Sequence, residues 1–120
     1  MDYRVGIVGD YVWGDLYDDN EKINFMKHRY GHADYYRGDE ESFVTLNAWL
    51  DGEVPPSNTR PGTTYEEPPN VIIAHLSGLD SVGHRYAVKD SEEYAEKLRW
   101  LDEHFGTIFE KVPELSLIHI

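Results

Sequence analysis

The sequence predicts an α/β fold in which a mostly parallel sheet carries helices on both faces. Two apolar, β-branched runs at 4–10 and 70–76 predict strands, and a long amphipathic segment at 90–112 predicts a helix after the second run. Strands that alternate with helices are typical of parallel sheets, because a parallel connection needs a crossover. A chain of 120 residues has room for one hydrophobic core, so we treat residues 1–114 as part of a single domain.

The first half of the chain is expected to supply two strands, one of them short, and two helices. RVGIVGD at 4–10 is punctuated by glycine and predicts a buried strand. We interpret 13–20 as a loop, predict a short helix over 21–31 from the spacing of its apolar residues, and consider 32–36 a short strand. GDEESFVTLNAWLDGE at 38–53 predicts a helix with an acidic first turn and a glycine stop.

The second half contains a proline-rich segment, the clearest strand and the longest helix. Residues 54–69 carry five of the six prolines, which predicts a surface loop. NVIIAHL at 70–76 is apolar almost throughout, as in a strand covered on both faces of a parallel sheet. The helix at 90–112 has Ser91 as its N-cap and an apolar stripe that we expect to pack on the sheet. The stripe consists of Tyr94, Leu98, Leu101, Phe105 and Phe109.

The chain is strongly acidic, with 23 Asp and Glu against 11 Lys and Arg and a net charge of −12. Nucleic acid and anionic lipid surfaces are bound through Lys and Arg, so we exclude nucleic acid as a partner. Carboxylates suit a divalent cation, although the same excess is also common on an ordinary soluble surface. Because the chain has no Cys, any metal must be held by His and carboxylates.

We expect this chain to contain no targeting or membrane-spanning segment. The first residues lack the basic and apolar segments of a signal peptide, and no run reaches the roughly 18 apolar residues of a membrane span. The last six residues, LSLIHI at 115–120, continue no earlier pattern and resemble translated sequencing-adapter sequence. We therefore expect 115–120 to be a non-native tail.

Asp80 and His84 form the strongest candidate site. They follow the strand at 70–76, and binding residues of α/β sheets gather beyond the carboxyl ends of the strands. If the segment forms a helical turn, the Asp-x-x-x-His spacing brings the two Cβ atoms within about 5–6 Å on one face, where a carboxylate and an imidazole could share one zinc ion. The alternative makes Asp80 a helix N-cap and His84 a surface residue. Gly78 and Gly83 bracket the turn and supply backbone freedom.

Asp10 and Trp13 form a second candidate site, because they follow the end of the strand at 4–10. In one interpretation they line a substrate pocket, with Trp13 as an apolar wall. In the other, Asp10 caps a turn and Trp13 belongs to the core. We interpret His75 as a buried histidine within its strand and His104 as a surface residue.

Two segments resemble a known superfamily. VIIAHLSGLDSVGHRY, followed by DSEEYAEKLRWLDEHFGTIFEKV, resembles the metal-binding segment of the alkaline phosphatase superfamily, in its type I phosphodiesterase/nucleotide pyrophosphatase and glycosylphosphatidylinositol (GPI) ethanolamine-phosphate transferase branch. Those proteins have an apolar strand, a Leu-Gly-[Leu/Ile]-Asp-x-x-Gly-His turn and a helix with an apolar-Asp pair, which here is Leu101 with Asp102. VGDYVWGDLY is similar to a segment of the transferases, with Val12 in place of their usual Thr.

The resemblance implies a fragment of an alkaline-phosphatase-like α/β domain from a metal-dependent phosphotransferase or phosphodiesterase. It assigns Asp80 and His84 to one zinc of a two-zinc centre and gives Asp102 no metal role. In such centres the metals activate the nucleophile and stabilise the transferred phosphoryl group. The family's Thr or Ser nucleophile segment and its downstream Asp-His pair are missing, so no catalytic residue is assigned and the fragment alone is expected to be inactive.

The implied substrate is a phosphate ester. Action in GPI anchor biosynthesis would make that substrate lipid-linked and the full-length protein membrane-associated. Two alternatives stay open. One is a sulfatase or a phosphoglycerate-mutase-like enzyme of the same superfamily, and the other is a non-catalytic, acidic α/β binding module.

Overall fold

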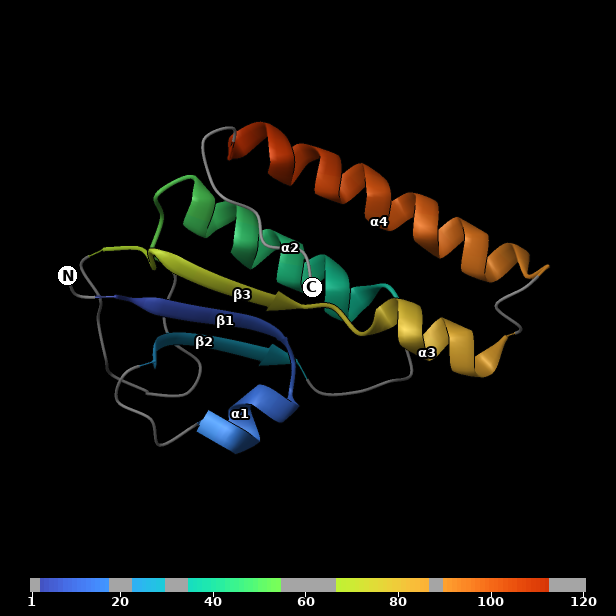
Figure 1. Ribbon diagram of the computed structural model, residues 1–120, viewed down its shortest axis with the longest axis horizontal. Helices are drawn as coiled ribbons and strands as arrows, with labels where there is room; N and C mark the ends of the chain where they lie inside the picture. The colour runs from blue at the N-terminus through green and yellow to red at the C-terminus, as the bar shows by residue number, and fades with distance from the viewer. Residues whose placement is uncertain (1–2, 18–22, 30–34, 55–66, 87–89, 113–120) are drawn as a thin grey trace.

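A parallel sheet forms the centre of the structure, and the described part of the chain contributes three strands to it (Figure 1). The strands are β1 (Val5–Asp10), β2 (Ile23–Arg29) and β3 (Val71–His75), in the order β2-β1-β3. The computed structural model describes residues 3–17, 23–29, 35–54, 67–86 and 90–112. The predictions for 18–20, 32–34, 55–66 and the tail at 115–120 lie outside these ranges.

The described residues also form four helices. They are α1 (Val12–Tyr17), α2 (Arg37–Leu50), α3 (Gly78–Arg85) and α4 (Glu92–Lys111). Helix α2 lies against the sheet, and α4 lies along α2 and α3 (Figure 1). On the face opposite α2, Trp13 of α1 reaches His75 of β3. The α/β class with helices on both faces is therefore confirmed. None of the helices in the described ranges combines the length and apolarity that a membrane crossing requires.

Strand β1 is buried on both faces, as its β-branched sequence predicts. In the parallel register Gly6 pairs with Ile72 and Val8 with Ala74, so these four residues face the same side of the sheet. Val8 packs there against Trp49 of α2. Ile7 points to the opposite side and is also buried. The central strand β1 therefore contributes buried side chains to both faces of the sheet.

The main hydrophobic core lies between α2 and α4, and Ile72 from β3 packs against it. Its buried members are Phe43, Leu46, Leu101, Ile108 and Val112. Helix α4 itself is confirmed, and the Ser91 hydroxyl oxygen accepts the Tyr94 N–H at 3.2 Å as the predicted N-cap. The predicted face is only partly right, because Leu98 and Phe109 are exposed while Lys97 is buried. Helix α4 packs chiefly on α2 and α3, so the expectation that its apolar stripe packs on the sheet is wrong.

Three predictions for the N-terminal half are wrong. Residues 23–29, inside the predicted helix 21–31, form β2, because parallel pairing with β1, which has one register shift between Val5 and Gly6, overrides a local helical spacing. Residues 13–17 of the predicted loop 13–20 belong to α1, and the Asp10 carboxylate accepts the Val12 N–H at 3.0 Å as this helix begins. Tyr35 and Tyr36 form a turn, not the end of a strand. The helix predicted at 38–53 is confirmed as α2.

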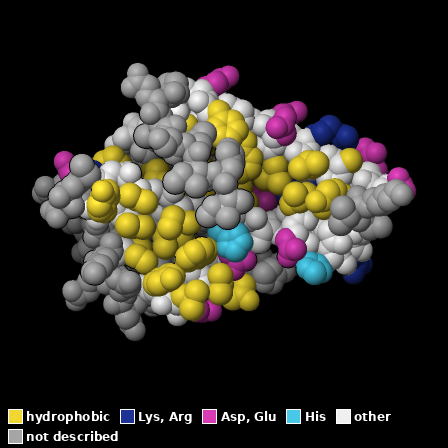
Figure 2. All heavy atoms as spheres, viewed as in Figure 1, with side chains coloured by type: hydrophobic (Ala, Val, Ile, Leu, Met, Phe, Trp, Pro, Cys, Tyr) yellow, Lys and Arg dark blue, Asp and Glu magenta, His cyan; other side chains and the backbone are white. Residues whose placement is uncertain are grey.

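Strand β3 is confirmed, but its cover on both faces is not. Ile73, on the side opposite α2, is 38% exposed, and His75 is exposed as well. Strand β3 is also an edge strand of the described sheet, so one of its two hydrogen-bonding edges has no neighbouring strand there. Figure 2 shows hydrophobic side chains gathered on the face seen in that view, and exposed Val12 and Leu16 of α1 add further apolar surface. The apolar run thus belongs to a half-covered strand.

Gly9 is needed where β1 ends. Its φ is +122°, and a Cβ atom at this position would collide with the His75 carbonyl oxygen. We expect Gly9→Ala to lower the free energy of unfolding by at least about 1–3 kcal/mol, the usual cost of such backbone strain. Urea denaturation measures this loss. Gly106→Ala is the control, because a Cβ in that open helical position meets nothing within 4 Å and should stabilise the chain slightly.

Candidate metal site

Helix α3 brings Asp80 and His84 together. The helix begins three residues after β3 ends, with Asp80 in its first turn and His84 in its last. Because the two residues are one helical repeat apart, their side chains share a face, and Asp80 Oδ2 lies 3.4 Å from His84 Nε2. The side chains are 78% and 80% exposed. Both are therefore open to a ligand beyond the carboxyl end of β3.

The distance between these two donor atoms fits a shared metal ion. Two ligands that each lie about 2.1 Å from one tetrahedral zinc ion are about 3.4 Å apart. The observed 3.4 Å separation of Asp80 Oδ2 and His84 Nε2 matches this geometry and is longer than an ordinary hydrogen bond. Within the described ranges, no group of three or more His, Asp or Glu side chains converges. These ranges therefore contain two candidate ligands, and their binding of a metal stays a prediction.

The second candidate pair lies where β1 ends. Asp10 uses Oδ1 to accept the Val12 N–H, which agrees with its interpretation as a capping residue. The Trp13 indole N–H donates to His75 Nδ1 at 3.0 Å, and the two rings meet edge to face. His75 is exposed, so its interpretation as a buried histidine is wrong. The ends of β1 and β3 thus share a polar and aromatic cluster whose use for substrate binding stays a prediction.

Trp13 fixes the tautomer of His75. An indole N–H is only a donor, so the Nδ1 atom that accepts from it carries no proton and the Nε2 atom carries one. We expect ¹⁵N NMR to find the Nε2–H tautomer of His75 dominant. Trp13→Phe keeps an aromatic ring without the donor, and should bring the two tautomers closer to equal population. An unchanged spectrum would contradict this hydrogen bond.

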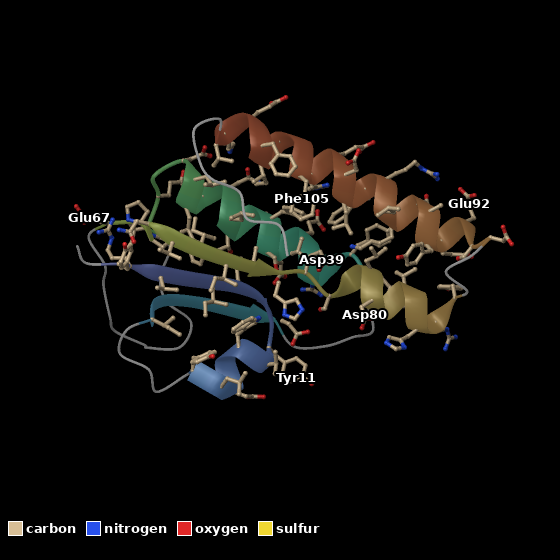
Figure 3. The ribbon with its side chains drawn as sticks, viewed as in Figure 1. Tyr11, Asp39, Glu67, Asp80, Glu92 and Phe105 are labelled. Carbon is tan, nitrogen blue, oxygen red and sulfur yellow. The ribbon has the colours of Figure 1, made fainter. Side chains whose placement is uncertain are left out.

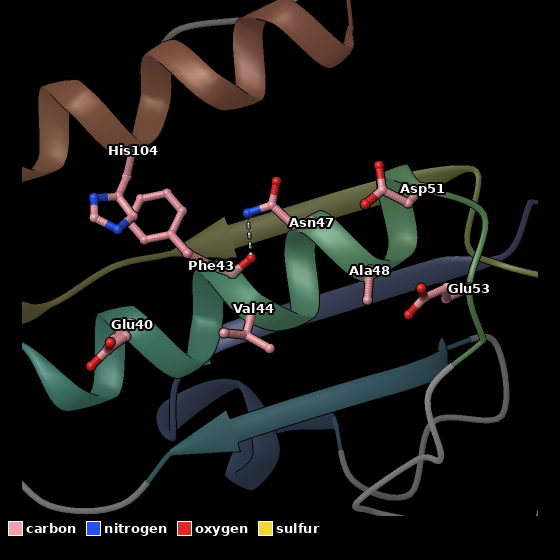
Figure 4. A pocket seen from close by; sticks show the side chains of 8 residues that line it. All are labelled: Glu40, Phe43, Val44, Asn47, Ala48, Asp51, Glu53 and His104. Carbon is pink, nitrogen blue, oxygen red and sulfur yellow. Dashed lines mark hydrogen bonds between the residues drawn. The ribbon is translucent and has the colours of Figure 1, made fainter.

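A shallow hollow of about 460 Å³ lies on the outer side of α2 and contains neither candidate pair (Figure 4). It is lined by Glu40, Phe43, Val44, Asn47, Ala48, Asp51, Glu53 and His104.

His104 was predicted to be a surface residue, but its ring lies 4.0 Å from that of Trp100 and 4.8 Å from that of Phe43, centroid to centroid. This histidine is therefore a packing residue between α4 and α2.

Lys97 and Asp39 form a buried ion pair that sequence analysis missed. Lys97 Nζ of α4 lies 2.8 Å from Asp39 Oδ2 of α2, and the side chains are 0% and 5% exposed. The same ammonium group lies 4.0 Å from the ring centroid of Trp100 and 4.4 Å from that of Tyr36. Burial raises the pKa of the Tyr36 phenol above its ordinary value of 10.0, so this ring is neutral at physiological pH. The cation is enclosed by one carboxylate and two aromatic faces.

Asp39 also touches the first residue of α3. The Gly78 N–H points to Asp39 Oδ1 at 3.3 Å. A Cβ atom at residue 78 would collide with the Asp39 carboxylate and the Tyr35 carbonyl, and would lie 2.9 Å from Lys97 Cε. Gly78 is therefore required for close approach, not for the backbone freedom proposed above. Figure 3 shows Asp39 beside the start of α3 and Asp80 on that helix.

The fold and the candidate site together define a class of protein. A parallel α/β sheet with polar residues just beyond the carboxyl end of a strand is the arrangement of ligand-binding α/β proteins, many of them enzymes. The sequence model of the type I phosphodiesterase / nucleotide pyrophosphatase family matches residues 15–119. The chain belongs to this family of phosphoryl-transfer enzymes, which is part of the alkaline phosphatase superfamily and generally metal-dependent.

The matched segment includes Asp80, His84 and Asp102, and leaves Asp10 and Trp13 outside. The resemblance to type I phosphodiesterases is thus confirmed, whereas the transferase branch is not distinguished by the match. No curated protein and no solved structure matches the chain significantly.

Proposed function

We propose that this chain is part of a zinc-dependent phosphodiesterase or phosphotransferase, in which Asp80 and His84 bind one zinc ion. The observation that carries the proposal is the 3.4 Å separation of their donor atoms on α3, within the family-matched segment and beyond the end of β3. The spacing, the exposure and the donor types all suit a borderline cation such as zinc. The substrate is a phosphate ester, in keeping with the family.

The chain's own residues hold and orient the ion. When bound, zinc supplies positive charge that stabilises a transferring phosphoryl group. Asp80 contributes a negative ligand, and His84 contributes a neutral one through Nε2. The nucleophile and the remaining ligands belong to other parts of a longer enzyme, with residues 1–114 as part of its catalytic domain and 115–120 as a non-native tail. The half-covered apolar side of β3 supports this, since such a surface normally packs against further chain.

Within the family we propose the GPI ethanolamine-phosphate transferase branch. The support is the VGDYVWGDLY segment, which places Asp10 and Trp13 at the carboxyl end of β1. In this proposal both residues contact the substrate, with the indole as an apolar wall. The substrate would be lipid-linked and the full-length protein associated with a membrane.

Metal analysis and substrate profiling of the full-length protein test the proposal. We expect stoichiometric zinc by mass spectrometry and turnover of phosphodiesters, with phosphoethanolamine transfer if the transferase branch is right. Preference for sulfate esters or phosphomonoesters would favour a sulfatase or a phosphoglycerate-mutase-like enzyme. A protein without bound metal and without turnover would be the acidic binding module.

A further inference from the structure

We propose that Asp39 is a positioning residue for the metal ligands of α3, held in place by Lys97. This inference deepens the proposed function and depends on it. Asp39 is the only described side chain found to accept the Gly78 N–H, and Gly78 is the residue at which α3 begins. Because Asp80 and His84 belong to the same short helix, the position of Gly78 determines the position of both side chains.

Burial restricts the movement of the Asp39 carboxylate that contacts Gly78. Asp39 Oδ1 faces Gly78 while Oδ2 lies 2.8 Å from Lys97 Nζ, so the two oxygens of one carboxylate join α3 to α4. Water is excluded, since Lys97 is 0% and Asp39 5% exposed. A carboxylate with both oxygens engaged in this way has one orientation, because turning it would leave a buried cation or a buried N–H unsatisfied.

The packing around Gly78 supports a positioning role over simple stability. The backbone of α3 approaches so closely that a single added methyl group would collide with Asp39. By contrast, Asp51 and Lys111 form an exposed pair between α2 and α4 at 2.9 Å, and neither contacts α3 in the interactions described. This exposed pair is a matched control, because it joins the same two helices without reaching the ligand helix.

Two charge-free double variants of the full-length protein test the inference. D39N/K97M removes both charges and keeps a side-chain oxygen that can accept the Gly78 N–H, whereas D39L/K97M also removes that acceptor. Zinc affinity is measured by competition with a chromophoric chelator, and cooperative unfolding is verified for each variant. Partners that orient metal ligands typically account for about 10- to 100-fold in affinity. We expect a loss of this size in D39L/K97M and little change in D39N/K97M or in D51N/K111M.

Equal zinc affinities in D39N/K97M and D39L/K97M would overturn the positioning role, whether both variants bind as tightly as the unsubstituted protein or both bind more weakly. Native-state hydrogen exchange of the unsubstituted protein provides a second test that does not depend on variants folding. The Gly78 amide should exchange as slowly as the buried amides of α4, and fast exchange would overturn the inference. If the unsubstituted protein binds no zinc, or keeps it in His84→Ala, the proposed metal site fails, and the exchange data alone then decide whether Asp39 fixes α3.

Discussion

The His84→Ala form of the full-length enzyme should lose zinc from this site and at least about 100-fold in turnover. Partners that only orient a metal ligand account for about 10- to 100-fold, so the loss of a ligand itself should exceed that range. The imidazole is about four-fifths exposed and contributes little to packing, so the variant should fold normally. Zinc content, turnover and thermal unfolding of the same preparation separate loss of the metal from loss of the fold.

Asp80→Asn tests the second ligand without changing the shape of the side chain. The amide keeps an oxygen but has no negative charge, so we expect it to weaken zinc binding severely. Asp102→Asn makes the same chemical change at an exposed position of α4 and should leave zinc and turnover unaffected. Unchanged turnover in both Asp80→Asn and His84→Ala would refute the assignment of ligands.

The parts of the fold that the sequence predicted correctly are those with strong local patterns. The runs that become β1 and β3 are apolar and β-branched, and α4 has a clear cap and period. Strand β2 was mistaken for a helix because its seven residues lack a strict alternation, and its state is decided by pairing with β1. The prediction that both faces of β3 are buried was wrong, because the position of a strand in its sheet and the layers that cover it depend on tertiary structure.

The same distinction applies to the candidate site. Asp80 and His84 were found from a spacing of four residues, which a helix converts directly into proximity. Asp39 and Lys97 have no such signal. Asp39 is one of several acidic residues at the start of α2, and a lysine on a long helix is normally exposed. Only the packing of α2, α3 and α4 makes this pair special, and a single sequence does not encode that packing in any local pattern.

Lys97→Met should destabilise the protein by about 3–5 kcal/mol, because it leaves the buried Asp39 carboxylate without its counter-charge. This is a large fraction of the roughly 5–15 kcal/mol that holds an average domain together. D39N/K97M should recover more than half of the loss, since neither residue is then charged. Urea unfolding of the two variants gives both values.

The exposed pair again provides the comparison. Lys111→Met removes a cation that lies 2.9 Å from Asp51 at the surface, where water replaces the lost partner. Its cost should stay below about 1 kcal/mol. A similar small cost for Lys97→Met would mean that the Asp39 carboxylate takes up a proton or reaches water once the lysine is gone. In that case the enclosure of the pair by Tyr36 and Trp100 would not exclude solvent, and the rigid contact with Gly78 would lose its physical basis.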